Sequence, residues 1–582
     1  MKKLIHVLFF LCIYHLPAAQ NFDSLDINNV KTHIYPSNVQ FTKADSIYSE
    51  TTFEFPNGSG KHTVFSSSIW LSAKNMNDWM FVSADRFGGP TLYPTFDFVS
   101  GPLDANANVH PDTILKYKRV WSITKAEIDS FQKWITNPVT LPMYYPSADL
   151  LSWPANSGGR PLAPYIDLNN NQTYDPLGGG DYPAIHGDKA IYFVLNDVGS
   201  NQEHTDGLPM GIELHCMFYA YNCKQSQAVD NTIFARYKLI NRSQNIYKHF
   251  LPTLFVDQDV GIAHANYIGT DVESGMVYTY NTKPLSYPYA YGDTAVATGA
   301  VILKGSEMPP NQIDDSPGSR FAVNGSGFGD GIVDNEYYGL TNSMYFNNYP
   351  NNYSFPFHDP KKDEEYYTYS RSKFMDQTHL KHGGTGHLSS SMNCRYMFPG
   401  DSDPLNYGTN FQAPPNTIPW KEDSSIAVPD DRRAILSSGN NIFFLPGETI
   451  ELHVAYTNAM VTGGNSDQVI DLIRTYADSL QYYYHNNSMP CSNGTNVGLK
   501  PAKNQSPVLK ISPNPASDNI AIQTNIEERY YLKLYNLIGK TLWYKNNNTG
   551  QSVVDISHLK PGIYLLEIGN KTKRSVRKFI KH

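Results

Sequence analysis

Oxygen-bearing side chains alternate along one short segment, from Asp167 to Asp175. A tight loop can turn alternate residues of this kind inward around one hard cation. The expected ligands, including one acidic residue just beyond the segment, are Asp167, Asn169, Asn171, Thr173, Asp175 and Asp181. The spacing predicts a Ca²⁺ site, and an Asx-rich turn without a metal is the alternative interpretation.

The segment departs from the EF-hand calcium loop at two positions. That loop has Gly at position 6 and Glu at position 12, where this chain has Gln172 and Gly178. The uncharged Asn169 and Asn171 are weaker ligands than Asp, so we expect modest affinity.

A second acidic loop follows a glycine-rich stretch at 325–329. It contains three carboxylates, Asp330, Asp334 and Glu336. Their alternate-oxygen spacing is incomplete, so this loop is a weak candidate for a cation site and more typical of a solvated turn.

Two carboxylate pairs could act as acid and base in a hydrolase, Asp257 with Asp259 and Asp401 with Asp403. Asp257 and Asp259 lie at the end of an expected strand, with Asp271 downstream, and could also bind Ca²⁺. The sequence contains no G-x-S-x-G nucleophile motif and no phosphate-binding loop. The motifs therefore identify no enzyme.

The elements that would position these residues are mostly strands. Short runs rich in β-branched and aromatic residues, bounded by turn residues, predict strands at 62–72, 79–85, 190–195, 212–221, 232–240, 250–256, 276–280 and 448–456. Polar and apolar residues alternate along 448–456, which predicts a strand with one buried face. We expect a mainly β chain of antiparallel β-sandwich domains with few short helices.

Two amphipathic helices interrupt this pattern. The capping box at Thr124 and Glu127 predicts a helix over 125–135. Ser466 is expected to cap a second helix over 467–484, whose apolar residues recur at three- and four-residue steps.

The expected organisation has five parts. They are a signal peptide (1–19), an N-terminal β-rich domain (20–188), a large β-sandwich (189–486) with an insertion at about 305–435, a linker (487–506) and a C-terminal module (507–582). The signal peptide follows from a basic start, an apolar core and small residues before a cleavage site. No later segment reaches 18 apolar residues, so no transmembrane segment is expected.

Cysteine usage places few constraints on the fold. Of the five cysteines, Cys12 lies in the expected signal peptide. The remaining four, at 216, 223, 394 and 491, lack the paired spacing of a zinc site. We expect at most one disulfide, with the pair left open.

The C-terminal module carries three landmarks in order, at 511–515, 534–540 and 559–566, followed by a basic tail. They resemble the type A C-terminal sorting domain of the type IX secretion system of Bacteroidota. The resemblance implies a small Ig-like β-sandwich, contact with the secretion machinery, and passage through the periplasm and outer membrane to the cell surface or the medium. The alternative is an ordinary terminal β-module.

Segments of the body, such as 163–167, 180–183 and 398–404, resemble large, uncharacterised exported proteins that carry the same tail. Their first loop runs Asp-x-Asn-x-Asp-Gly, and this chain departs from it at Asn171 and Gln172. The resemblance implies no activity.

Composition narrows the function. The tail from 507 has 12 Lys and Arg against 5 Asp and Glu, while the whole chain has a net charge of −8, so the body is acidic. An acidic body argues against nucleic acid as a partner. With 41 Tyr and abundant Asn, the chain is expected to be a non-enzymatic adhesion or glycan- or matrix-binding protein. The alternative is a secreted hydrolase of polysaccharide or protein.

Overall fold

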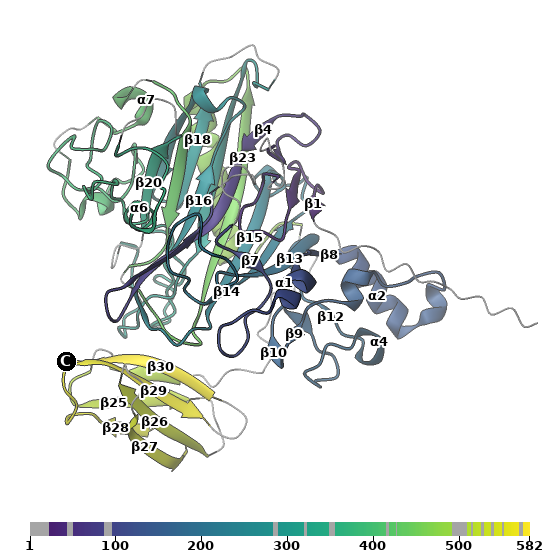
Figure 1. The fold of residues 1–582 in the computed structure, drawn as a ribbon. Coiled ribbons are helices and arrows are strands. Elements are labelled where there is room, and N and C mark those ends of the chain that lie inside the picture. The colour runs from purple at the N-terminus through teal and green to yellow at the C-terminus, as the bar shows by residue number, and fades with distance from the viewer. Residues whose placement is uncertain are drawn as a thin grey trace, which may run out of the picture.

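The body of the chain is a β-sandwich, and the C-terminal module is a second, smaller one (Figure 1). The computed structural model describes residues 22–43, 50–86, 96–282, 289–318, 323–348, 355–414, 418–426, 428–440, 442–491, 509–513, 516–524, 529–536, 541–549, 552–569 and 574–582. The expected signal peptide and most of the expected linker lie outside these residues.

Two antiparallel sheets form the body. The nine-stranded sheet has the order β17 (Asn266–Asp271), β18 (Met276–Asn281), β19 (Thr294–Lys304), β23 (Thr449–Thr462), β15 (Thr232–Asn241), β14 (Ile212–Ala220), β13 (Lys189–Asn196) and β7 (Val99–Ser100), with β8 (Trp121–Thr124) also paired to β13. The six-stranded sheet has the order β20 (Asn342–Asn347), β21 (Arg432–Ser437), β16 (Tyr247–Asp257), β5 (Ser66–Asn75) and β6 (Met80–Ala84), with β22 (Ile442–Phe444) also on β16. The mainly β, antiparallel fold class is confirmed.

Short elements complete the body. The remaining strands form two-stranded pairs, and they are β1 (Asp23–Leu25), β2 (Thr32–Ile34), β3 (Phe53–Glu54), β4 (His62–Val64), β9 (Asn156–Ser157), β10 (Arg160–Pro161), β11 (Tyr165–Ile166) and β12 (Tyr182–Pro183). The helices are α1 (Pro111–Tyr117), α2 (Lys125–Thr136), α3 (Ala148–Leu151), α4 (Pro176–Gly179), α5 (Gln227–Asp230), α6 (Asp363–Tyr369), α7 (Glu422–Ser425) and α8 (Ser466–His485). Among the described residues, no helix is long and apolar enough to span a membrane.

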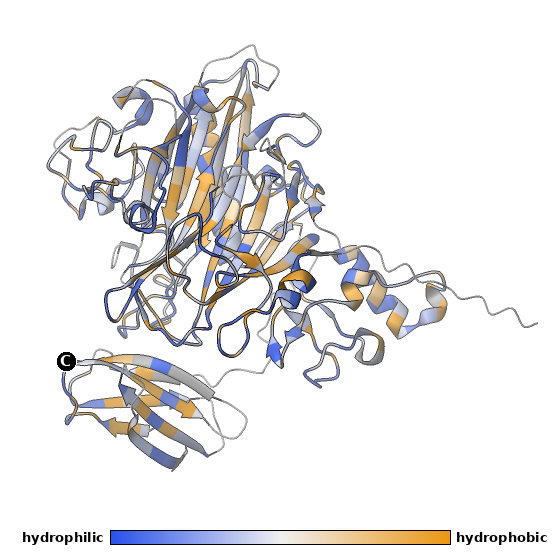
Figure 2. Cartoon of the chain, in the orientation of Figure 1, coloured by the Kyte–Doolittle hydropathy of each residue, from blue (hydrophilic) through white to orange (hydrophobic). Residues whose placement is uncertain are grey.

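The nine-stranded sheet is buried on both faces. Along β13, Ile191 and Phe193 point into the core between the two sheets, whereas Tyr192 and Val194 point into a second core on the opposite face. This split follows from the two-residue period of a strand. Figure 2 shows apolar residues, in orange, along the same strands. The single buried face expected for 448–456 is therefore wrong, because α8 packs over the other face of β23.

Helix α8 covers that second face. Its apolar stripe is buried at every expected position, namely Val469, Ile470, Ile473, Tyr476, Ala477 and Leu480. Its N-cap is Asn465, one residue before the expected Ser466. Asn465 and Gln468 form a reciprocal capping box, which a cap at 466 could not form with Gln468.

Helix α2 begins after Thr124, whose hydroxyl accepts the backbone N–H of Glu127, as expected. The Glu127 carboxylate instead accepts the backbone N–H of Ser147, in the segment before α3. Half of the predicted capping box is thus replaced by a tertiary contact.

Strands from both sides of residue 188 share both sheets. Strand β5 pairs with β16, and β8 pairs with β13. The N-terminal region therefore contributes to the same sandwich as residues 189–486. Cys223 and Cys491 form a disulfide across a sequence separation of 268 residues, while Cys216 and Cys394 are buried free thiols.

The C-terminal module has its own core. One sheet contains β24 (Leu509–Ser512), β25 (Asn519–Thr524) and β28 (Ser552–Asp555), and the other contains β27 (Thr541–Asn548), β26 (Tyr530–Asn536), β29 (Gly562–Gly569) and β30 (Arg574–Lys581). Ile520, Leu532, Leu566 and Phe579 are buried between them. Two runs of β-forming residues, 530–535 and 563–568, lie in β26 and β29, and these strands pair with each other.

Candidate functional site

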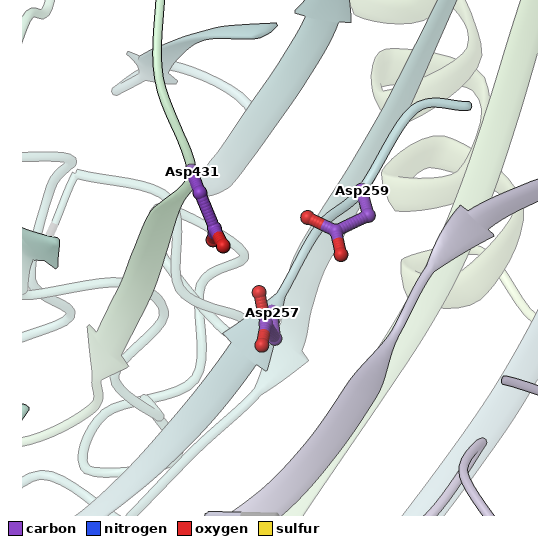
Figure 3. Close-up of side chains that lie close together, drawn as sticks. All are labelled: Asp257, Asp259 and Asp431. Carbon is purple, nitrogen blue, oxygen red and sulfur yellow. The ribbon is translucent and has the colours of Figure 1, made fainter. Parts of the chain in front are cut away.

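Three carboxylates meet at one end of the six-stranded sheet (Figure 3). Asp257 is the last residue of β16, Asp259 follows two residues later, and Asp431 immediately precedes β21. The antiparallel pairing places Asp257 opposite Arg433, so Asp431 lies just beyond the same end of the sheet. One ligand oxygen from each lies within 4.8 Å of the others, and no second such group of His, Cys, Asp or Glu occurs in the described part of the chain.

Burial makes this cluster electrostatically unusual. Asp257 is 1% exposed, and Arg433 Nε donates to its Oδ2 over 2.9 Å. Burial, together with the charges of Asp431 and Asp359, outweighs the Arg433 guanidinium and raises the pKa of Asp257 to about 7. Burial and the neighbouring Asp257 charge raise the pKa of Asp259 well above its usual range. We call Asp257, Asp259 and Asp431 the aspartate triad.

Two arginines neutralise part of this negative charge. Arg433 Nη1 lies 2.8 Å from Asp359 Oδ1, and Arg86 Nη1 lies 3.1 Å from Asp359 Oδ2. The ion pairs connect the end of β6, the segment containing Asp359 and the start of β21. Asp257 and Asp259 lie two residues apart in the sequence, whereas the contact with Asp431 depends on the pairing of β16 with β21 and has no local sequence signal.

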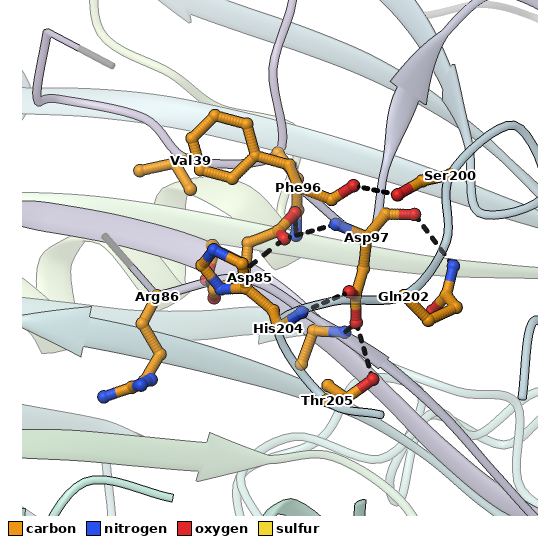
Figure 4. Close-up of polar contacts among 12 residues, drawn as sticks. Val39, Asp85, Arg86, Phe96, Asp97, Ser200, Gln202, His204 and Thr205 are labelled. Atoms are coloured by element: carbon orange, nitrogen blue, oxygen red, sulfur yellow. Dashed lines mark hydrogen bonds and ion pairs between the residues drawn. The ribbon is translucent and has the colours of Figure 1, made fainter. Parts of the chain in front are cut away.

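A second buried network contains Asp85, Asp97 and His204 (Figure 4). Backbone N–H groups of Ala84 and His204 donate to Asp97, as does the Thr205 hydroxyl. Burial raises the pKa of Asp97 to about 6, and burial lowers the pKa of His204 to about 3. All three side chains are at most 1% exposed, so this network holds the fold together and does not face solvent.

The predicted calcium loop forms a set of Asx turns. Asp167 accepts the backbone N–H groups of Asn171 and Gln172, and Asp181 accepts those of Leu168 and Asp175. The carboxamides of Asn169 and Asn171 lie 3.3 to 3.5 Å from the Asp175 carboxylate, and the Asn171 side-chain oxygen accepts the N–H of Thr173. Burial, and then contact with Asp175, raises the pKa of Asp181.

The second acidic loop does not bring its carboxylates to one point. Asp330 accepts the N–H of Ile332, and Asp334 accepts those of Asn311 and Gln312. Glu336 is buried and accepts the N–H of Asp315. Each carboxylate therefore stabilises a different turn.

The other candidate acid–base pair is engaged within the fold. Asp401 accepts Arg474 Nη1 over 2.8 Å, and the Arg474 charge helps to lower the pKa of Asp401 against the effect of partial burial. Asp403 accepts the backbone N–H groups of Tyr407 and Gly408, both over 2.8 Å. The two carboxylates thus have separate structural partners.

Comparison with known protein families identifies the type of the C-terminal module. Residues 510–582 match the family model of the secretion system C-terminal sorting domain. No curated protein matches the chain. Among solved structures, a polysaccharide lyase matches with 8% identity and a TM-score of 0.16, over 63% of this chain and 34% of the lyase. A TM-score this low shows neither a common fold nor a common activity.

The sorting domain determines where the chain goes. It marks the protein for export by the type IX secretion system, so the protein is secreted or located at the cell surface. It also implies that the tail interacts with the secretion machinery.

Proposed function

We propose that the exported chain is a non-enzymatic adhesion protein that binds glycan or matrix at the cell surface or in the medium. The observation that supports it most directly is Trp79, which is 64% exposed. It is the only exposed Trp of seven, all of which lie in described segments. The other six indoles are buried or partly buried, so Trp79 alone offers a largely exposed indole to a partner.

Trp79 is held by a rigid turn between β5 and β6. The Asn75 side-chain oxygen accepts the backbone N–H groups of Asn77 and Trp79, over 2.9 and 3.0 Å. Asn75 and Trp79 also bond through their backbones. A turn with a fixed backbone loses little entropy on binding, and the exposed indole presents a flat apolar face for the C–H groups of a sugar.

Polar groups surround the turn and suit the hydroxyls of a glycan. Lys248 Nζ pairs with Asp78 Oδ1 over 2.7 Å, and Lys74 is the register partner of Lys248. Met76, in the same turn, is also exposed. An aromatic side chain with polar residues around it is a common composition of recognition surfaces.

The experiment compares binding of three forms of the mature chain to immobilised cellulose, xylan, chitin, pectin and collagen. They are the wild type, Trp79→Ala and a matched control, Tyr482→Ala, which removes an equally exposed aromatic ring from α8. We expect the wild type and the control to bind at least one support. Trp79→Ala should bind that support about tenfold more weakly, which corresponds to a loss of about 1.4 kcal/mol in the free energy of binding. Equal binding by all three forms would exclude Trp79 as the contact, and binding to none would remove the support for this function.

We also propose that the 167–181 loop binds Ca²⁺ weakly through Asp167, Asn169, Asn171, Thr173, Asp175 and Asp181. In support, burial, followed by the side chain of Asp175, raises the pKa of Asp181, and a cation between the two carboxylates would favour their charged forms. Millimolar Ca²⁺ should raise the melting temperature of the wild type more than that of Asp167→Ala with Asp175→Ala, because the ion binds only the folded loop. Identical shifts in the two proteins would leave the Asx-turn interpretation. We make no such proposal for Asp330, Asp334 and Glu336.

A further inference from the structure

We propose that the aspartate triad holds one divalent, oxygen-preferring cation, and that Ca²⁺ fits it best (Figure 3). The site is separate from the 167–181 loop and from the Trp79 turn. It joins the end of β16 to the start of β21, so the ion would act as a structural element of the six-stranded sheet.

The spacing of the ligand atoms fits a calcium ion. Calcium binds oxygen at about 2.3–2.6 Å, so two ligands on opposite sides of the ion lie about 5 Å apart. The three triad oxygens lie within 4.8 Å of one another, which places all of them inside one such shell. All three donors are carboxylates, the ligand type that calcium and magnesium prefer and that zinc and copper sites seldom use alone.

Unsatisfied oxygens point to a missing ligand. The Oδ1 atoms of Asp257, Asp259 and Asp431 are each buried without a hydrogen-bond partner among the described residues. Asp257 and Asp431 are only 1% and 5% exposed. A buried polar atom with no partner costs about 1–3 kcal/mol, and more when it is charged. These unpartnered atoms belong to the three carboxylates that approach one another within 4.8 Å, and an ion between the carboxylates would give each of them a partner.

The side-chain hydrogen bonds to Asp257 and Asp431 use the other carboxylate oxygen, Oδ2. Arg433 Nε binds Asp257 through Oδ2, not Oδ1. The Asn348 carboxamide donates to Asp431 Oδ2 over 2.6 Å. In Asp257 and Asp431 a protein donor thus holds Oδ2 and leaves Oδ1 available to an ion, as outer-shell contacts do in metal sites.

The charge balance favours a divalent ion. The cluster holds four carboxylates, those of the triad and Asp359, against the two guanidiniums of Arg86 and Arg433, which pair with Asp257, Asp359 and Asp431. This leaves an excess of two negative charges in a buried network, which one divalent cation would neutralise. The alternative is that the triad retains protons, which requires no ion.

Asp259→Asn distinguishes a bound ion from retained protons, because no described hydrogen bond depends on the Asp259 side chain. If an ion is bound, the substitution removes a ligand and lowers the melting temperature in Ca²⁺. In EDTA the same substitution relieves repulsion and should leave the melting temperature unchanged or higher. Asp471→Asn, which neutralises an exposed residue of α8, should change neither value.

Metal content gives a second readout that does not depend on the folding of a triad variant. The mature chain carrying Asp167→Ala and Asp175→Ala, with the weak loop disabled, is equilibrated with Ca²⁺, passed through gel filtration and analysed by mass spectrometry. We expect about one Ca²⁺ per chain, and near zero after Asp259→Asn is added. No retained Ca²⁺, or a higher melting temperature of Asp259→Asn in Ca²⁺ as well as in EDTA, would overturn the proposal and show that the triad holds protons.

Discussion

Arg433 and Asp257 face each other across the β16–β21 pair, and Arg433 Nε donates to Asp257 Oδ2 over 2.9 Å. Both side chains are almost fully buried, at 3% and 1% exposure. The same guanidinium also binds Asp359, so a single side chain compensates two buried carboxylates. Removal of Arg433 would therefore leave charge inside the protein, not merely break one contact.

Arg433→Met should lower the free energy of unfolding by about 3–5 kcal/mol, because Asp257 and Asp359 lose their nearest buried cation. Arg433→Lys keeps the charge but not the planar fork, so it should cost less. Urea denaturation of the mature chain measures both. Unfolding of Arg433→Met at the wild-type urea concentration would contradict the structural role assigned to this residue.

The position of the α8 N-cap gives a second prediction. Asn465→Ala should destabilise the protein by about 1 kcal/mol, because its side chain accepts the Gln468 N–H. Ser466→Ala, the matched change one residue later, should have little effect. The melting temperatures of the two variants distinguish the two caps. A larger decrease in Ser466→Ala than in Asn465→Ala would show that Ser466 caps α8.

Buried histidines should make the protein sensitive to mild acid. Arg236 Nε donates to His453 Nε2 over 3.0 Å, so that nitrogen must be unprotonated. Burial, followed by the Arg236 charge, lowers the pKa of His453 to about 3, from an ordinary value near 6.5. The unfolded chain therefore takes up a proton below pH 6.5 that the folded chain refuses until about pH 3, and stability falls as the pH drops through this window.

Between pH 7.5 and 5.5, His453 alone should cost about 1.4 kcal/mol of stability. The side-chain oxygen of His453→Gln can still accept the hydrogen bond from Arg236. Over the same pH range, the stability of this variant should therefore fall by about 1.4 kcal/mol less than that of the wild type. Urea denaturation at the two pH values measures the difference. Equal losses in the two proteins would show that His453 is protonated in the fold.

Deletion of residues 507–582 should retain the protein in the periplasm with its body still folded. The C-terminal module has a separate core, and it carries the sorting signal. Cell fractionation locates the truncated protein, and its resistance to protease reports folding. Normal amounts of truncated protein in the medium or on the cell surface would contradict the sorting role.

Local patterns were enough to predict many of these elements. The stripe of α8 and the Thr124 cap of α2 depend on residues within a few positions of each other, so their spacing reveals them. The burial of both faces of β23 could not be predicted in this way, because it depends on α8 packing against a distant part of the chain.

The aspartate triad illustrates the same limit. Asp257 and Asp259 are two residues apart and stand out in the sequence, whereas Asp431 joins them only through the pairing of β16 with β21. The Asp167–Asp175 spacing is also conspicuous in the sequence, and this segment folds into a series of Asx turns. Spacing identifies local turns well, and sites assembled by sheet pairing poorly.

Simultaneous measurement of binding and cleavage tests the proposed function most directly. The mature chain is incubated with a polysaccharide that it binds, and bound protein and newly formed reducing ends are followed in the same sample. A binding protein should remain bound and release no new reducing ends over many hours. A steady rise in reducing ends that is abolished by Asp401→Asn or Asp403→Asn would contradict the account and show a hydrolase.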